Sequence, residues 1–307
     1  MTETVAILGA RGRFGRHAAA AFGEAGWRVR GVVRRDAAEG ADETVLAEGG
    51  DAEAVTRACD GAAVIVQALN PPYPDWAREL PRFTDACLAA AKATGATVVL
   101  PGNVYVYGSA MPEALTEATP RAPDTRKGRL RVELERAYEA AAGEGVRTIL
   151  LRGGDFLDTR LAGNWFERFI SAEVAKGRAI YPGPTDRPHA WAFLPDMARA
   201  AAALAAKRAE LPAFRAVGFP GLAPTGAELA AAMGRAAGRE LEVRPFPWWQ
   251  LRLISPFSAM IREVLEMRYL WDVPHRIDGA DFEALLPDFP ATPLDEAVRA
   301  ALAPRLT

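Results

Sequence analysis

The stretch that decides the fold is Thr4 to Arg35, TVAILGARGRFGRHAAAAFGEAGWRVRGVVRR. It opens with an apolar run, Val5 to Leu8, and the lack of alternation in that run is typical of a strand buried on both faces of a parallel sheet. Glycines follow at Gly9, Gly12 and Gly15, and apolar residues at helical spacing come after them. A strand, a glycine turn and an amphipathic helix in this order predict a dinucleotide-binding unit.

The three glycines have different expected roles. Gly9 allows a sharp turn off the strand, Gly12 lets backbone approach a pyrophosphate, and Gly15 lets the helix pack closely on the sheet. The helix begins near Arg13 and Phe14, where unpaired N–H groups and a partial positive charge face the phosphates. We therefore expect all five residues in the cofactor site. The alternative is a tight turn that binds nothing.

The next strand, Val29 to Val33, indicates which dinucleotide binds. It runs directly into Arg34 and Arg35, and Arg11 lies inside the glycine turn. An NAD site usually has a carboxylate at the end of this strand, whereas arginine suits the 2′-phosphate of NADP. Asp36 comes one or two places late, so we expect NADP(H) rather than NAD(H). A solvated basic loop is the alternative.

The composition of the chain narrows the kinds of partner and location that we expect for it. The chain has 307 residues, half of them hydrophobic and a quarter charged, with a formal net charge of −2. This balance gives no indication of a nucleic-acid or membrane partner, and we expect a small-molecule substrate and a monomer or homodimer. Two cysteines do not make a disulfide framework. Because neither a signal peptide nor an apolar run of roughly 18 residues is present, we expect a cytoplasmic protein.

Further strands extend the same pattern. Glu43 to Asp51 reads as a third strand, and Asp51 can either meet the adenine or cap the helix that follows. The apolar strand Ala62 to Ala68 delivers Ala68 and Leu69 to a carboxyl end, where ligands of such sheets lie. Continued alternation of strands and helices predicts an α/β fold built on a Rossmann-type doubly wound parallel sheet.

Four segments carry a family resemblance. They are GARGRFG from Gly9, VYG at Val106–Gly108, LRGGDF at Leu151–Phe156 and WAFLPDMARA at Trp191–Ala200. With them the chain resembles the extended and atypical short-chain dehydrogenases/reductases, the NAD(P)-dependent epimerase and dehydratase group. The resemblance implies a Rossmann core over residues 1–155, with returning segments near 188–215, and a smaller C-terminal α+β substrate region over 156–307.

The chain departs from this family at the catalytic residues. Active members use a Ser and a Tyr-x-x-x-Lys pair, but Asn103 stands at the serine position and the pair falls on Thr125 and Arg129. A threonine hydroxyl cannot act as an acid near neutral pH as a tuned tyrosine can. Arg129 can still hold the ribose hydroxyls and lend positive charge, so it is a candidate for both the cofactor site and the catalytic site.

Other residues can supply the missing proton donor. Tyr107 and Tyr105 leave a strand at its cofactor end, and ordinary packing is the alternative for each. Asn103 can hold a carbonyl oxygen, and Lys127 can lower the pKa of a tyrosine.

Three functions remain open. The favoured one is an NADP(H)-dependent oxidoreductase that reduces a small or hydrophobic carbonyl or enone. The second is a non-catalytic NADP(H)-binding sensor like the NmrA-like members of the family. The third is a sugar-nucleotide epimerase or dehydratase, which the missing Ser and Tyr/Lys residues disfavour most, because those reactions begin by oxidising a hydroxyl.

Substrate contacts are expected beyond the Rossmann core. Phe156 follows a strand end, Trp165 opens an aromatic segment, and His189 and Trp191 precede an apolar stretch. Plain loop or core positions are the alternatives. The three histidines are too scattered in sequence to propose a metal site.

The C-terminal part contains an apolar series at helical spacing, Phe257, Met260, Ile261, Val264 and Leu265. We expect this series to form core of the small lobe. A lid or dimer surface with an apolar pocket is the alternative, and such a pocket would suit a hydrophobic carbonyl better than a sugar nucleotide.

Overall fold

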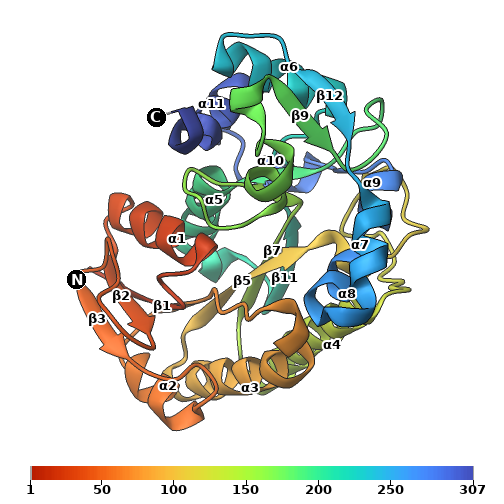
Figure 1. Ribbon diagram of the computed structural model, residues 1–307. Helices are drawn as coiled ribbons and strands as arrows, with labels where there is room; N and C mark the ends of the chain where they lie inside the picture. Colours follow the sequence, from red (N-terminus) through yellow and green to blue (C-terminus); the bar gives the residue numbers. More distant parts are fainter. Residues whose placement is uncertain (1, 307) are drawn as a thin grey trace.

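A computed structural model describes residues 2–306 of the chain (Figure 1). Strand β1 (Thr4–Leu8) leads through the glycine turn into helix α1 (Arg13–Glu24), and β2 (Arg28–Val33) follows. β1 pairs with β2 on one side and with β4 (Val64–Gln67) on the other, so it lies inside the sheet. The predicted unit of strand, turn, helix and strand is confirmed.

The central sheet has seven strands, all parallel. Besides the three above it contains β3 (Glu43–Leu46), β5 (Thr97–Asn103), β7 (Thr148–Gly153) and β11 (Phe214–Gly218). The main helices around it are α2 (Ala52–Ala58), α3 (Trp76–Thr94), α4 (Arg126–Ala141) and α5 (Leu194–Ala206). The strand order is β11-β7-β5-β4-β1-β2-β3. The chain therefore moves outward from β1 in both directions, and the crevice between β1 and β4 is where ligands of such sheets bind.

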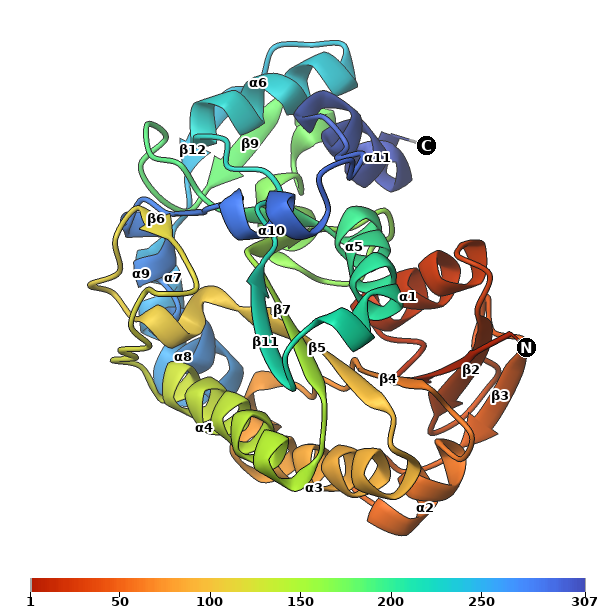
Figure 2. The ribbon, with the colours of Figure 1, turned by 180° about the vertical axis from the view of Figure 1, so that it is seen from behind.

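Helices cover both faces of the sheet. α1 and α5 lie on one face, over a core that includes Val5, Ile7 and Val66. α2, α3 and α4 line the other face, where the neighbouring strand residues Ala6 and Leu8 point (Figures 1 and 2). Because both faces are buried, β1, β4 and β7 need apolar residues at nearly every position. The predicted doubly wound α/β fold is confirmed.

A smaller α+β region lies beyond the carboxyl ends of the strands. Its strands form two-stranded parallel pairs: β8 (Asp155–Leu157) with β10 (Trp191–Phe193), β9 (Arg178–Tyr181) with β12 (Glu242–Pro245), and β6 (Ala114–Leu115) with β13 (Arg276–Ile277). Its helices are α6 (Gly226–Ala237), α7 (Trp248–Ile254), α8 (Ala259–Glu266), α9 (Tyr269–Asp272), α10 (Ala280–Leu285) and α11 (Leu294–Leu306).

Short helical segments complete the fold. They are η1 (Tyr73–Asp75), η2 (Val104–Tyr107), η3 (Ala142–Glu144), η4 (Phe166–Ile170), η5 (Val174–Lys176), η6 (Arg208–Glu210) and η7 (Ser255–Phe257). The smaller region has a core of its own, to which β9, α6 and α11 contribute. Within residues 2–306, no helix combines the length and apolar character that crossing a bilayer requires.

Two expectations from the sequence are wrong. The third strand ends at Leu46 rather than Asp51, because Gly49 and Gly50 turn the chain before α2 begins. Phe257 and Met260 do not belong to the core of the small lobe, since their side chains face solvent. Helical spacing identifies residues that share a face but does not say what covers that face.

A buried ion pair fixes α4 to the sheet. Arg152 of β7 donates to Glu135 of α4 through two hydrogen bonds, 2.7 and 2.9 Å long, and also to the carbonyl oxygen of Asn103 at 2.7 Å. Both charged side chains are almost fully enclosed. A bidentate pair is directional as well as strong, so it sets the position of α4 against β5 and β7.

Replacing Glu135 by alanine should leave the Arg152 charge buried without its carboxylate. We expect Glu135→Ala to lower the free energy of unfolding by about 3–5 kcal/mol in urea denaturation. The matched control is Glu139→Ala on the same helix. It removes a half-exposed ion pair with Arg121 and should cost no more than about 1 kcal/mol. Equal losses in the two variants would contradict the role given to the buried pair.

Candidate functional site

The glycine turn has the geometry that a dinucleotide site requires. Gly9 adopts φ +79°, and its carbonyl oxygen accepts the Gly12 N–H at 2.8 Å. A Cβ added at Gly15 would lie 2.2 Å from that same oxygen, so only glycine fits there. No side chain caps the start of α1, so its first N–H groups stay available to a ligand. Phe14 itself is buried in the core.

The end of β2 carries exposed cations. Arg34 and Arg35 are exposed, and neither forms an ion pair with a described residue. Arg11 pairs with Asp36, and it also donates to the carbonyl oxygen of Arg35 at 3.2 Å. Asp36 adopts φ 58°, which is uncommon for a residue other than glycine. The two free arginines are therefore placed to receive an anion.

The segment after β4 lines the other side of the turn. Ala68 contributes backbone within 3.3 Å of where a Gly9 Cβ would be, and Leu69 reaches across to Gly49. Asp51 caps α2 by accepting the Ala54 N–H at 3.0 Å, which is one of the two roles expected for it. Its carboxylate is thus held at the helix start.

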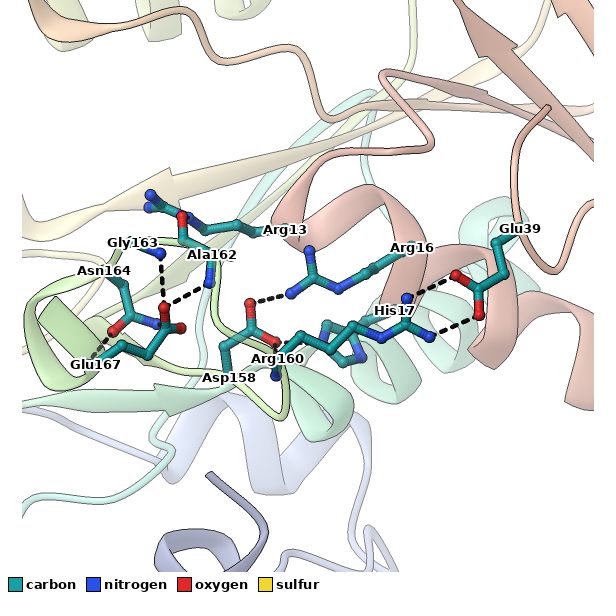
Figure 3. A network of polar contacts seen from close by, with 10 residues as sticks. All are labelled: Arg13, Arg16, His17, Glu39, Asp158, Arg160, Ala162, Gly163, Asn164 and Glu167. Carbon is teal, nitrogen blue, oxygen red and sulfur yellow. Dashed lines mark hydrogen bonds and ion pairs between the residues drawn. The ribbon is translucent and has the colours of Figure 1, made fainter. Parts of the chain in front are cut away.

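A loop over residues 158–167 lies along α1, and Figure 3 shows the contacts that hold it. Asp158 accepts from Arg16 and from His17, whose Nε2 lies 2.9 Å away. Arg13 donates its Nε to the carbonyl oxygen of Ala162 at 2.8 Å. Arg13 and Arg16 therefore hold this loop, so phosphates at the α1 N-terminus would be met mainly by backbone N–H groups.

Further contacts stabilise the same loop. Arg160 forms two 2.6 Å hydrogen bonds with Glu39, and Glu167 accepts the N–H groups of Ala162 and Gly163 (Figure 3). Burial acts to raise the pKa of Asp158, but the hydrogen bonds from His17 and Arg16 outweigh it, so the pKa is lowered overall.

Two tyrosines meet where β4 and β5 end. The hydroxyl groups of Tyr73 on η1 and Tyr105 on η2 lie 3.0 Å apart, and either can donate. Trp76 packs against both rings. Burial raises the pKa of both phenols, and further for Tyr105, whereas the hydrogen bond and the cations Arg131 and Arg13 act to lower the pKa of Tyr73. Tyr73 is partly exposed whereas Tyr105 is buried, so Tyr73 is the hydroxyl of this pair that a substrate can reach.

Lys127 and Arg131 lie one turn apart on the inner face of α4. The ammonium of Lys127 is buried 5.2 Å from the centre of the Tyr73 ring, and it pairs with Glu263 at 2.5 Å and with Glu266. Arg131 donates to the Asn70 side chain at 2.8 Å and lies over the Trp76 ring. The two cations thus border the tyrosine pair at the spacing of a Tyr-x-x-x-Lys motif.

The two positions that the family resemblance assigns to that motif do not face the tyrosine pair. Thr125 caps α4 by accepting the Gly128 N–H at 3.1 Å, and Arg129 is exposed and donates to the carbonyl oxygen of Asp124. Gly128 fixes the rotation of the helix, because a Cβ there would lie 2.5 Å from the Tyr105 carbonyl oxygen. The side chains of Thr125 and Arg129 consequently lie away from the tyrosine pair.

Asn103 and Tyr107 take other positions. The side chain of Asn103 accepts the Tyr105 N–H at 3.1 Å and so caps η2. Tyr107 lies against Arg152, and its hydroxyl donates to the carbonyl oxygen of Thr116 at 3.4 Å. Of the two tyrosines expected as donors, only Tyr105 joins a second hydroxyl.

The expected substrate residues come together around Trp271 of α9. His189 stacks on the Trp271 ring at 4.2 Å, with Trp165 at 5.2 Å and Trp191 at 5.9 Å. His189 also bonds Asp155, the first residue of β8, at 2.9 Å. The negative charge of Asp155 lies near enough to Tyr73 and Tyr105 to contribute to the raised pKa of both.

Two further observations complete the placement of these residues. Phe156 is partly exposed and packs with the core on the α1 side of the sheet. The rings of His189 and His275 lie 4.5 Å apart, although the residues are far apart in sequence. Among the described residues, no three His, Cys, Asp or Glu side chains are grouped as a metal site would need.

Sequence reasoning missed several residues of this site. Tyr73 follows the strand end that was expected to carry cofactor contacts, so its position was a usable signal. The sequence already indicates Lys127 as a residue that can lower the pKa of a tyrosine, and Arg131 could have been found as its i, i+4 partner on the same helix. Nothing in the sequence indicated that Trp271 would join the aromatic group, because α9 is only four residues long.

Comparisons with known proteins show which solved structures share the fold of this chain. No family model matches the chain, and no curated protein matches it. Solved structures do: a Burkholderia cenocepacia J2315 protein described as an epimerase has a TM-score of 0.78 at 20% identity, covering 99% of this chain and 98% of that one. A UDP-galactose 4-epimerase has a TM-score of 0.75 at 19% identity, covering 99% and 100%.

A third similar structure, MoeE5 in complex with UDP-glucose and NAD, has a TM-score of 0.73 at 19% identity and covers 98% of this chain and 99% of that one. Identities this low establish the fold alone. The fold that these proteins share with this chain spans nearly its whole length.

The buried His275 should make stability depend on pH. Burial, together with the neighbouring His189, lowers its pKa from 6.5 to about 3. Below pH 6.5 the unfolded chain therefore binds a proton at His275 that the folded chain does not bind. The free energy of unfolding has its full value above pH 6.5 and falls as the pH drops below it. We expect about 1.4 kcal/mol of unfolding free energy to be lost per pH unit.

The measurement is urea denaturation at several pH values between 6.5 and 5, above the range where most carboxylates titrate. His275→Gln removes the titrating ring, so its unfolding free energy should change less across the same interval. A variant whose pH dependence matched that of the parent would rule out His275 as the source.

Proposed function

We propose that this chain is a nicotinamide-dependent oxidoreductase of the short-chain dehydrogenase/reductase type, which uses NADP(H) and reduces a small or hydrophobic carbonyl or enone. The observation that carries the proposal is the Tyr73–Tyr105 hydroxyl pair. It lies at the carboxyl ends of β4 and β5, beside the crevice that the glycine turn borders. A proton donor and a dinucleotide cradle at one sheet edge are what a carbonyl reductase needs.

The residues at the cofactor end fit such a dinucleotide. A Cβ at Gly15 would fill the cradle, and the uncapped start of α1 offers N–H groups to a pyrophosphate. Arg34 and Arg35 suit a 2′-phosphate, with Arg11 nearby. Binding of NAD by a protein of the same fold, MoeE5, supports a nicotinamide cofactor in general. The choice of NADP(H) rests on the arginines.

When bound, the nicotinamide supplies the hydride to the substrate carbon. Tyr73 donates a proton to the substrate oxygen, and Tyr105 stabilises the resulting phenolate by donating its own hydroxyl hydrogen bond. The positive charges of Arg131 and Arg13 favour that phenolate, while Asp155 opposes it. This arrangement replaces the family's Tyr and Lys with a tyrosine from η1 and cations from α4 and α1.

The surroundings favour an apolar substrate. Trp165, Trp248 and Trp271 gather where the smaller region faces the site, together with Phe169 and Phe246. A diphosphate would need uncompensated cations, but two glutamates already neutralise Lys127. A hydrophobic carbonyl gains from burying area against these rings and needs no such charge.

A second candidate is a sugar-nucleotide epimerase or dehydratase, which the named activities of the similar structures favour. Such reactions begin by removing a proton from a hydroxyl, and burial, by raising the pKa of Tyr73, leaves little of the phenolate base at neutral pH. An NADP(H) sensor is the third candidate. It would bind both redox forms without turnover, so assays with carbonyl substrates separate it from the reductase.

The proton donor can be identified with three single Tyr→Phe variants, at Tyr73, Tyr105 and Tyr107. We expect Tyr73→Phe to lower kcat for NADPH-dependent carbonyl reduction by about 100-fold or more. Tyr105→Phe should have a smaller effect, and NADPH affinity should stay nearly unchanged in both. A fall in kcat confined to Tyr107→Phe would move the donor to Tyr107, one of the two tyrosines that the sequence alone indicates.

Cofactor choice can be tested at Arg34. Arg34→Glu removes a charge-assisted hydrogen bond to the 2′-phosphate, so NADPH affinity should fall by about 10- to 100-fold, with little change for NADH. Titration calorimetry measures both. Arg136→Glu on the exposed face of α4 is the matched charge control and should alter neither. Equal weakening of NADPH and NADH by Arg34→Glu would place this arginine elsewhere on the cofactor.

A further inference from the structure

Five large apolar side chains stand in solvent on α7, η7 and α8. Their exposed fractions are 63% for Trp249, 67% for Leu253, 51% for Ile254, 90% for Phe257 and 38% for Met260. We call these residues the 249–260 patch. Single exposed apolar residues are ordinary, but five within twelve positions mark a surface that meets a partner.

The patch is held in a defined shape. Ser258 caps α8 by accepting the Ile261 N–H, and Arg262 donates to the carbonyl oxygens of Ser255 and Pro256 at 2.9 and 3.2 Å. These bonds close the η7 turn on both sides of Phe257. The exposure of Phe257 therefore belongs to an ordered turn rather than a loose chain end.

Both helices of the patch are anchored to the body of the protein. The indole of Trp248 donates to the carbonyl oxygen of Pro182 at 2.7 Å, at the start of α7. On α8, Glu263 and Glu266 pair with the buried Lys127. The inner faces of these helices thus reach the candidate site, while their outer faces carry the patch.

The charged residues within the patch segment are arginines. From Pro245 to Arg262 the chain has Arg252 and Arg262 and no aspartate or glutamate. The carboxylates that flank this stretch are already paired, Glu242 with Arg244 and Glu263 with Lys127. Arg252 is exposed and forms no ion pair with any residue in the described range. The net charge of −2 for the whole chain conceals this locally cationic segment.

We propose that the 249–260 patch docks the protein on a membrane surface that carries anionic phospholipids. Trp249, Leu253 and Phe257 enter the boundary between headgroups and acyl chains, and Arg252 meets lipid phosphates. Aromatic and aliphatic residues beside arginine on short surface helices are the composition that binds such interfaces.

A second copy of the chain fits this surface less well. A two-fold contact through the patch would bring Arg252 toward its own counterpart, with no carboxylate in the segment to receive either charge. An anionic bilayer satisfies the apolar side chains and the arginines together.

Docking on a membrane would also explain why the proposed substrate is apolar. α8 connects the patch to Lys127 beside the tyrosine pair, so a carbonyl compound dissolved in the bilayer would be delivered near the site. This consequence rests on the proposed function, whereas docking itself does not.

The test is co-sedimentation of the full chain with vesicles, without cofactor or substrate. One set is phosphatidylcholine alone, and the other is an equal mixture of phosphatidylcholine and phosphatidylglycerol. We expect binding to the mixed vesicles, weaker binding in high salt, and little binding to phosphatidylcholine alone. Failure here would leave the oxidoreductase proposal standing, because no turnover is measured.

Variants locate the contact. The double variant Leu253→Ser/Phe257→Ser should bind mixed vesicles at least about ten-fold more weakly, since it removes two inserted side chains. Arg252→Glu should remove the preference for anionic lipid without disturbing any buried group. The control is Leu46→Ser, an equally exposed leucine on β3, which should bind as the parent does.

Several results would overturn the proposal. One is no binding by the folded parent protein to mixed vesicles. Another is unchanged binding by both the double variant and Arg252→Glu. A third is a concentration-dependent dimer that the double variant abolishes in the absence of lipid, which would assign the patch to self-association.

Discussion

The close approach of α1 to the end of β1 is the constraint on which the rest of the structure depends. A Cβ at Gly15 would lie 2.2 Å from the Gly9 carbonyl oxygen, so the helix can start this near the strand only with glycine at that position. This contact aims the N-terminus of α1 at the crevice between β1 and β4. The exposed arginines after β2 and the tyrosines after β4 and β5 then gather at the same sheet edge, because parallel strands all end on one side.

The cationic residues at the two ends of that sheet edge differ in their burial and in their ion pairing. At the β2 end, Arg34 and Arg35 are exposed without ion-pair partners in the described chain, as an anion site requires. At the α4 end, Lys127 is buried and neutralised by two glutamates of α8. Burying that ammonium without its carboxylates would be very costly, so α8 must stay docked on α4. The same docking leaves the outer face of α8 in solvent.

The fold and the geometry of the glycine turn could be predicted from the sequence, and much of how side chains gather beside β4, β5 and α4 could not. Trp165, His189 and Trp191 were each chosen separately, and the structure gathers them around Trp271. The family resemblance implies Thr125 and Arg129 as the α4 pair, but their side chains lie away from the two tyrosines. An i, i+4 spacing fits either register, and only the contact of Gly128 with the Tyr105 carbonyl oxygen selects the face that turns inward.

By itself the sequence determined the glycine turn, the buried parallel strands and the basic end of β2, because each is a local pattern whose physics acts within a few residues. Only the tertiary structure decided that Tyr73 meets Tyr105, that Asp155 meets His189, and that Phe257 is exposed. These outcomes depend on how separate elements approach one another. A periodic pattern tells which side chains share a face, but the packing of the whole chain decides what that face meets.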